Sequence, residues 1–196
     1  MPRICLVTHF FPPHIGGIEK VSYEQSKLLT KSGYEFDVLT SKVKGQTEKP
    51  INGLRVFPYS SLKLAEKFGI PYPILTIQAY KHFAKIIKDC DLVHIHGHVY
   101  MSSYLAAKLA KKYHKPLIVT QHNTFIDYKS WFTILEHLND LVIGKAILKK
   151  ADQILTVSKE TKKYVLKLGA EKSKTSVMYN GVDTKCFHTI QKEESR

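Results

Sequence analysis

Residues 8–20 read THFFPPHIGGIEK, and this stretch decides the fold. It follows an apolar run at residues 4–7 that is typical of a buried strand. The segment after it carries apolar residues at helical spacing, namely Ile18, Val21, Leu28 and Leu29. Gly16 and Gly17 are therefore predicted to lie where a strand turns into a helix. Two glycines there allow positive φ values and close approach of a ligand, and the helix N-terminus favours an anion such as phosphate.

A plain tight turn is the alternative interpretation of this glycine pair. The stretch is neither a dinucleotide fingerprint nor a P-loop, because it contains no G-x-G-x-x-G and no G-K-[ST].

The composition describes a globular protein with a strong positive charge. The chain has 196 residues, 43% of them hydrophobic, which suits one large domain or two small ones. Thirty Lys and Arg residues against 17 Asp and Glu give a net charge of +13, which suits phosphate-rich ligands, nucleic acid or an anionic membrane. Residues 145–174 hold nine lysines against three acidic residues, and a solvated helical face is the alternative interpretation of that region.

The cysteine count and the hydropathy favour a cytoplasmic protein. Cys5, Cys90 and Cys186 are odd in number and far apart, which argues against a disulfide framework. No apolar stretch is long enough for a signal peptide or a membrane span.

Strand patterns alternate with helical patterns along the chain. Strands are expected at residues 4–7, 36–40, 54–57, 91–96, 117–121, 153–157 and 175–179. Helices are expected after residue 17, near 77–88, at 101–113, at 131–150 and from Ser158, as N-cap, to Leu168. This alternation predicts an α/β, Rossmann-like three-layer domain with a mainly parallel sheet of about seven strands.

In such sheets ligands bind beyond the carboxyl ends of the strands. The segments just past those ends are residues 9–17, 96–100, 122–124, 158 and 180–183. They bring His9, His98, His122, Asn123 and Thr124 to one edge, as candidates for binding a sugar. A histidine at this place can hydrogen-bond a sugar hydroxyl or move a proton near neutral pH, although an inconsequential loop histidine is the alternative for His122.

A metal site is the other chemistry that these histidines suggest. His94, His96 and His98 alternate along one strand, but no carboxylate cluster accompanies them. We therefore expect no metal, and we expect His94 to be a hydrogen-bonded core histidine. The D-x-D pattern at residues 89–91 precedes its strand and lies at the wrong edge of the sheet for a ligand.

Five motifs in order resemble the N-terminal domain of glycosyltransferase family 4. They are P-P-x-x-G-G-I-E, D-L-V-H-I-H, V-T-Q-H, A-D-Q-I-L-T-V-S and N-G-V-D-T-x-x-F. Together with the opening strand, these motifs span residues 3–187. The resemblance implies one half of a GT-B fold, in which an acceptor domain and a donor domain face a cleft. It also implies a retaining enzyme that transfers a hexosyl group from a UDP- or GDP-linked sugar to a glycan, lipid or lipid-linked acceptor.

The resemblance also assigns roles to residues. Gly16 and Gly17 would close on the donor diphosphate, and His122 would be the catalytic residue. Glu19 and Lys20 would line the acceptor side. Asn180, Gly181 and Asp183 would lie near the interdomain hinge. Catalysis would need orientation and stabilisation of the leaving phosphate, with no protein nucleophile and no cofactor.

This chain departs from the family pattern in one respect. The resemblance implies a donor half that carries two glutamates eight positions apart in family members. No pair of glutamates here has that spacing. We therefore expect residues 1–188 to form the acceptor-side domain, residues 189–196 to be a linker, and the donor-binding domain to be absent from this chain. Alone, such a domain is expected to be inactive.

Other classes of function stay open on the sequence. A non-catalytic glycan- or lipid-binding module, or one component of a two-chain transferase, is the main alternative, and a sugar epimerase of related fold is another. Nucleic acid is not expected as a partner, because no zinc, helix-turn-helix or RNP signature is present. Peripheral contact with an anionic membrane is suggested by basic residues beside apolar ones, at Lys63, Lys67, Lys81, Lys85, Trp131 and Phe132.

Overall fold

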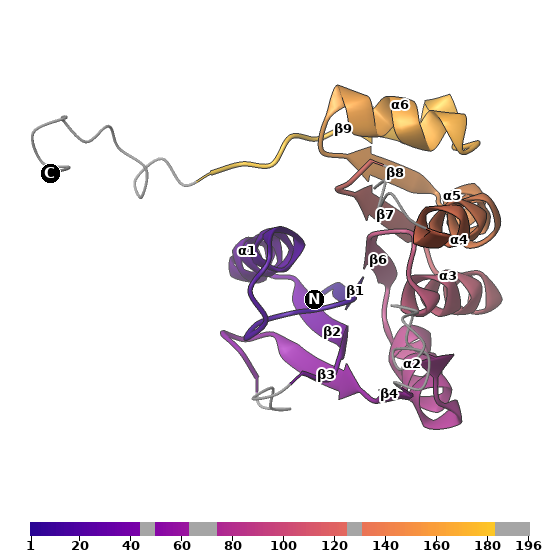
Figure 1. Ribbon diagram of the computed structural model, residues 1–196. Coiled ribbons are helices and arrows are strands. Elements are labelled where there is room, and N and C mark those ends of the chain that lie inside the picture. Colours follow the sequence, from indigo (N-terminus) through magenta and orange to yellow (C-terminus); the bar gives the residue numbers. More distant parts are fainter. Residues whose placement is uncertain (44–49, 63–73, 125–130, 183–196) are drawn as a thin grey trace, which may run out of the picture.

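The computed structural model describes residues 1–43, 50–62, 74–124 and 131–182 (Figure 1). Its centre is a seven-stranded sheet in the order β3-β2-β1-β6-β7-β8-β9, with every neighbouring pair parallel. The strands are β1 (Arg3–Thr8), β2 (Glu35–Ser41), β3 (Arg55–Tyr59), β6 (Leu92–His96), β7 (Leu117–Gln121), β8 (Gln153–Thr156) and β9 (Thr175–Val177). The predicted α/β class and the strand count are confirmed. The strand order reverses between β1 and β6, where ligands bind in open parallel sheets.

Helices cover both faces of the sheet, as its two-sided burial requires. The helical elements are α1 (Gly17–Lys31), α2 (Ile77–Asp89), α3 (Met101–Lys112), α4 (Trp131–Asn139), η2 (Asp140–Gly144), α5 (Lys145–Lys150), α6 (Lys159–Lys167) and η3 (Lys172–Lys174). Figure 1 shows α1 on one side of the sheet and α2 to α5 on the other. A short antiparallel pair, β4 (Ser61–Leu62) with β5 (Ile74–Leu75), was not predicted.

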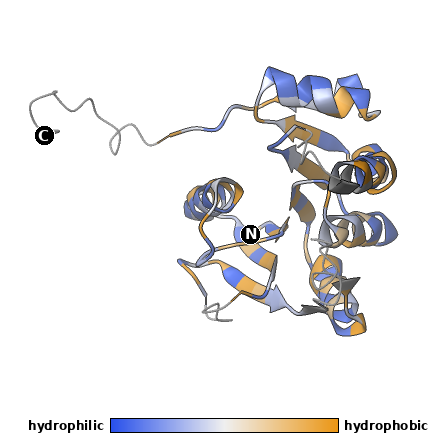
Figure 2. Cartoon of the chain, in the orientation of Figure 1, coloured by the Kyte–Doolittle hydropathy of each residue, from blue (hydrophilic) through white to orange (hydrophobic). Residues whose placement is uncertain are grey.

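Side chains on the two faces of the sheet belong to two separate hydrophobic clusters. Cys5 and Val7 of β1 belong to the larger cluster, with α2, α3, α5 and α6, whereas Leu6 belongs to the smaller one beside α1. In Figure 2 the strands show orange bands among blue and pale ones, whereas α6, which carries five charged residues, is largely blue. The lysine-rich region is therefore in part a solvated helical face, which was one of its two interpretations.

Three local predictions need correction. The buried residues of α1 are Ser22 and Ser26, whereas Leu28 and Leu29 are 61% and 40% exposed. The strand predicted at residues 54–57 runs on to Tyr59 with Pro58 inside it, which is tolerated because β3 is an edge strand. The predicted helix at residues 131–150 is interrupted by η2, a π-helical turn.

The capping residues of two helices have the conformations that caps require, and the predicted cap at Ser158 is confirmed. Gly33 follows α1 with φ of +92°, the left-handed conformation that favours glycine. Ser158 caps α6, since its Oγ accepts a hydrogen bond from the Thr161 backbone N–H at 3.0 Å.

Candidate active site

The carboxyl ends of β1, β6 and β7 lie side by side and bring His96 and His122 together. His96 pairs with Thr8 on one side and with Thr120 on the other, so the loops that follow these strands leave the sheet at the same edge. His96 Nδ1 lies 3.0 Å from His122 Nε2, and the two rings are stacked with centroids 5.0 Å apart.

Both rings of this pair are held neutral. Burial lowers the pKa of His122 to about 4. Burial also lowers the pKa of His96 well below its ordinary value, with further contributions from His94 and His122. Two neutral rings that share one hydrogen bond must have opposite roles, one as donor and one as acceptor. The tautomer of His96 therefore fixes whether the free nitrogen of His122 donates or accepts a hydrogen bond.

His94 is a partly buried histidine of the strand β6, and its predicted hydrogen bond is confirmed. Its Nε2 lies 2.8 Å from the Oγ1 atom of Thr120, and burial lowers its pKa to about 4, helped by His122. No group of three or more His, Cys, Asp or Glu side chains that could hold a metal occurs among the described residues.

His9 lies at the carboxyl end of β1 in an aromatic setting. Its ring is stacked on Tyr100 with centroids 4.2 Å apart, and its Nδ1 lies 3.4 Å from Ser41 Oγ. Burial lowers the pKa of His9 to about 4, and His14 adds to the shift. His9 is thus a neutral, partly buried ring at the predicted edge of the sheet.

The glycine pair does lie between β1 and α1, but the predicted positive φ values are wrong. Gly16 is the N-cap of α1 with φ of −171°, an extended conformation that any residue adopts, and Gly17 is not among the glycines with positive φ. The restriction at Gly16 is steric: a Cβ there would lie 2.1 Å from Glu19 Oε2. A Cβ at Gly17 would meet nothing within 4 Å.

The carboxylate of Glu19 therefore lies over the N-terminus of α1, where the sequence predicts a phosphate. Its Oε1 is 3.1 Å from Nδ1 of His14. The positive end of the helix dipole favours a negative charge, and here the side chain of Glu19 supplies that charge in place of a bound anion. Lys20, the next residue, is exposed.

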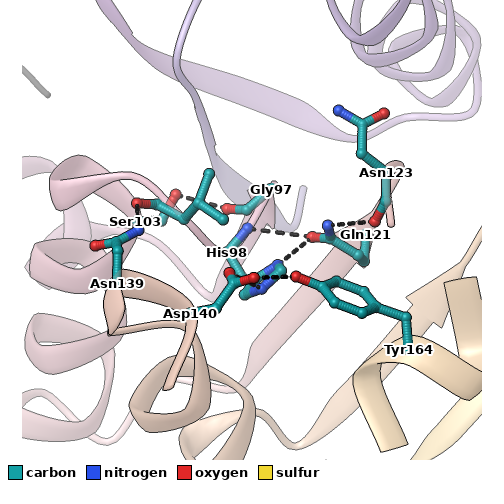
Figure 3. A network of polar contacts seen from close by, with 9 residues as sticks. Gly97, His98, Ser103, Gln121, Asn123, Asn139, Asp140 and Tyr164 are labelled. Carbon is teal, nitrogen blue, oxygen red and sulfur yellow. Dashed lines mark hydrogen bonds and ion pairs between the residues drawn. The ribbon is translucent and has the colours of Figure 1, made fainter. Parts of the chain in front are cut away.

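His98 lies in a buried network of polar contacts (Figure 3). Its Nδ1 is 2.6 Å from Gln121 Oε1, and its Nε2 is 3.1 Å from Asp140 Oδ1. Tyr164 donates its hydroxyl to the other oxygen of Asp140. Since the His98 side chain is 0% exposed and both ring nitrogens have partners inside the protein, no free nitrogen carries the predicted contact with a sugar.

Four further predicted site residues lie on the surface. Asn123 and Thr124 follow β7 and are exposed, and Asn180 and Gly181 follow β9 and are exposed. Asp183 lies outside the described residues.

Comparison with known proteins identifies the family. Residues 15–185 match Glycosyltransferase Family 4. The chain belongs to glycosyltransferase family 4. The resemblance seen in the five motifs is therefore confirmed.

Two curated relatives of this family 4 chain are similar over most of its length. It is 25% identical over 200 residues to "Uncharacterized glycosyltransferase MJ1069" of Methanocaldococcus jannaschii, a match that covers 98% of this chain and 51% of the relative. It is 27% identical over 194 residues to a phosphatidylinositol N-acetylglucosaminyltransferase subunit of Arabidopsis thaliana, covering 94% of this chain and 41% of the relative. The family 4 chain thus spans about half the length of these relatives or less.

Among solved structures, HepE of Anabaena, in complex with UDP and glucose, superposes with a TM-score of 0.67. The identity is 14%, and the match covers 97% of this chain and 47% of HepE. At that identity the likeness shows the fold alone, and it agrees with one half of a GT-B fold.

Sequence reasoning missed the partners of His98. Gln121 was predicted only as the end of a strand, and Asp140 and Tyr164 only as parts of helices. One signal was present: Asp140 is an acidic residue directly before the apolar run LVIG, where a charge needs a buried partner.

Proposed function

We propose that this chain is the acceptor-side domain of a retaining glycosyltransferase that moves a hexosyl group from a UDP- or GDP-linked donor to a glycan, lipid or lipid-linked acceptor. One observation carries the proposal, the neutral His96–His122 pair at the carboxyl edge of the sheet of a family 4 domain. The HepE structure is a complex with UDP and glucose, which supports a UDP-linked donor. The Arabidopsis relative is named for phosphatidylinositol, which supports a lipid acceptor.

The chemistry follows from the charge of the groups at this edge. A neutral His122 offers a hydrogen bond to a hydroxyl of the donor sugar or acceptor, without placing a positive charge there. The donor diphosphate would bind at the N-terminus of α1, where the backbone N–H groups stabilise the leaving phosphate. The carboxylate of Glu19 would have to swing away first, because it occupies the approach over Gly16.

The test is an assay of sugar transfer by the full natural protein, with UDP-sugars and GDP-sugars as donors. We expect His122→Ala to lower kcat at least about 100-fold, within the range of general acid–base and hydrogen-bond contributions. The exposed His114, which has φ of +53°, gives a matched control as His114→Asn, because asparagine tolerates that conformation. An H122A protein with the kcat of the H114N control would remove His122 from the mechanism.

A second readout of the same assay is the anomeric configuration of the product. Retention is expected, and an inverted product would refute the proposed reaction. No metal is required in this scheme, so EDTA is expected to leave the rate unchanged.

Contact with an anionic membrane is proposed through exposed apolar side chains of α2, α4 and η2, with lysines of α2 and α5. Large apolar side chains are exposed there, namely Ile77, Tyr80, Ile134, Leu138, Leu141 and Val142. Exposed lysines accompany them, namely Lys81, Lys85, Lys145 and Lys149. Exposed apolar groups beside lysines favour an anionic interface. Lys63 and Lys67 lie outside the described residues, as do the side chains of Trp131 and Phe132.

No helix in the described part of the chain has the length and apolar character needed to cross a bilayer. The test is flotation with anionic and with neutral vesicles. Leu138→Glu is expected to reduce binding to anionic vesicles, whereas Leu28→Glu, at a 61% exposed site on α1, is expected to leave it unchanged. Absence of binding to both vesicles would refute the membrane proposal without affecting the transferase proposal.

The competing function is a non-catalytic binding module or one component of a two-chain transferase. The Arabidopsis relative is named as a transferase subunit, which is the observation that favours it. Turnover by the full natural protein alone decides for the single-chain enzyme. Turnover that needs a second chain decides for the two-chain transferase.

A further inference from the structure

We propose that His98, Asp140 and Gln121 form a positioning device that holds His122, and that the device keeps one buried proton on the ring of His98. The proposal rests on the proposed role of His122, although its central test does not depend on sugar transfer. Figure 3 shows the network, which joins the loop after β6, the loop after β7, η2 and α6.

The amide of Gln121 can have only one orientation. Its oxygen lies 3.2 Å from the backbone N–H of His98, which can only donate a hydrogen bond. Its nitrogen donates to the backbone carbonyl of Asn123 at 2.8 Å, which can only accept. Oε1 of Gln121 is therefore an acceptor, so Nδ1 of His98, 2.6 Å away, must carry a hydrogen.

The proton count of the pair follows from this orientation. With Nδ1 protonated, Nε2 of His98 faces Oδ1 of Asp140 at 3.1 Å, and one proton must lie between these two atoms. The second oxygen of Asp140 accepts a hydrogen bond from Tyr164, and such a bond favours the ionised carboxylate. We therefore infer that the proton lies on the ring of His98, as an imidazolium beside the carboxylate of Asp140. The side chains are 0% and 2% exposed, so this ion pair is isolated from water.

The π-helical turn η2 packs against the ring of His98 and supplies its partner Asp140. It begins at Asp140 and ends at Gly144, and a Cβ at Gly144 would lie 2.5 Å from Cδ2 of His98. A π-helical turn inserts an extra residue into the helix, and such turns often occur at functional sites. Next to the turn, Asn139 donates to the carbonyl of Val99 at 2.8 Å, which holds the β6 loop against the same element.

His122 lies between Gln121 and Asn123, the two residues that this network holds in place. The side chain of Gln121 reaches back to the carbonyl of Asn123 and so closes the backbone around His122. The ring of His122 is in turn held by His96. If Asp140 releases the ring of His98, Gln121 loses its 2.6 Å hydrogen bond to that ring, its amide is held less firmly, and the loop that carries His122 can shift. Asp140 and His98 thus act on His122 through Gln121, without contacting substrate.

The test compares Asp140→Ala with Asp140→Asn in protein with ¹⁵N-labelled histidine, followed by NMR of the ring nitrogens at pH 7. In the parent, both nitrogens of His98 are expected to be protonated. Asparagine can donate to Nε2 of His98 and accept from Tyr164, so D140N is expected to deprotonate Nε2 and leave the signals of His122 in place. D140A is expected to shift the signals of His122. An unprotonated nitrogen in the parent His98, or unmoved His122 signals in D140A, would overturn the proposal.

The kinetic arm uses the full natural protein. D140A is expected to lower kcat about 10-fold with the donor KM within twofold, and D140N is expected to restore kcat to within about threefold. Thr156→Val is the matched control for stability, since the buried Thr156 donates to the carbonyl of Ser176 at 3.1 Å, outside this network. Equal kcat in D140A and T156V at similar Tm would refute positioning. A parent protein without any turnover would refute the proposed function. The NMR result would still decide whether His98 is protonated and whether Asp140 affects His122.

Discussion

Lowering the pH from 7 to 5 is expected to destabilise the protein through its buried histidines. Burial lowers the pKa values of His9, His94 and His122 to about 4, against an ordinary value of 6.5. The unfolded chain therefore binds protons between pH 6.5 and 4 that the folded protein does not bind. Stability is present in full above pH 6.5 and is lost as the pH falls toward 4.

The size of the effect follows from these values. For one such histidine the contribution to the free energy of unfolding drops by about 2 kcal/mol between pH 7 and pH 5. Neighbouring rings cause part of each other's shifts, so about 3 to 5 kcal/mol is expected for the set rather than the simple sum. Domains are in general stable by roughly 5–15 kcal/mol, so this loss is a large fraction.

Urea unfolding at both pH values measures the loss. With an m-value of about 2 kcal/mol/M, the midpoint should fall by about 2 M urea at pH 5. His122→Gln keeps an amide group near the position of Nε2 but does not titrate, so it should remove about 1–2 kcal/mol of the pH dependence. The exposed His114, as His114→Asn, should leave it unchanged. Equal midpoints at pH 7 and 5, or an unaltered pH dependence in H122Q, would refute the reasoning.

Three further predictions concern local contacts. Ser158→Ala removes the cap of α6 and should cost about 1 kcal/mol in urea unfolding, whereas no change would show that the 3.0 Å bond to Thr161 contributes nothing. Gly144→Ala places a methyl group 2.5 Å from the fixed ring of His98 and should destabilise by about 1–3 kcal/mol, which thermal unfolding measures. Glu19→Gln removes a negative charge over the N-terminus of α1 and should tighten UDP binding about 3- to 10-fold by calorimetry, in keeping with a helix-end interaction of about 1 kcal/mol, and weaker binding would contradict the phosphate assignment.

The sheet could be predicted from the sequence because parallel strands buried on both faces are continuous apolar runs. Residues 117–121, for example, were predicted with the bounds that the structure gives. The burial of α1 could not be predicted from its leucines, because the positions that pack on the sheet are the serines at 22 and 26. Helical periodicity gives the spacing of a face but not which face meets the sheet.

The edge of the sheet that carries the candidate site could be predicted, and so could the approach of the segments after β1, β6 and β7 to one another at this edge. The role of His98 could not be predicted. Its partners lie 23 and 42 residues away in sequence, and the contact depends on a π-helical turn that has no clear periodic signature. Gly16 was recognised for the wrong reason, since a side chain three residues later, not the sign of φ, sets its constraint.

The position of β1 inside the sheet, between β2 and β6, has a consequence for biosynthesis. β1 pairs with β2, which follows it closely, but also with β6, and the contact between Arg3 and Asp91 spans 88 residues. When the ribosome has released only the first three strands, β1 is still an open edge that can pair with strands of other chains. The nascent chain passes through this state until residues 92–96 emerge, so chaperone capture and aggregation during translation should be greatest in that interval.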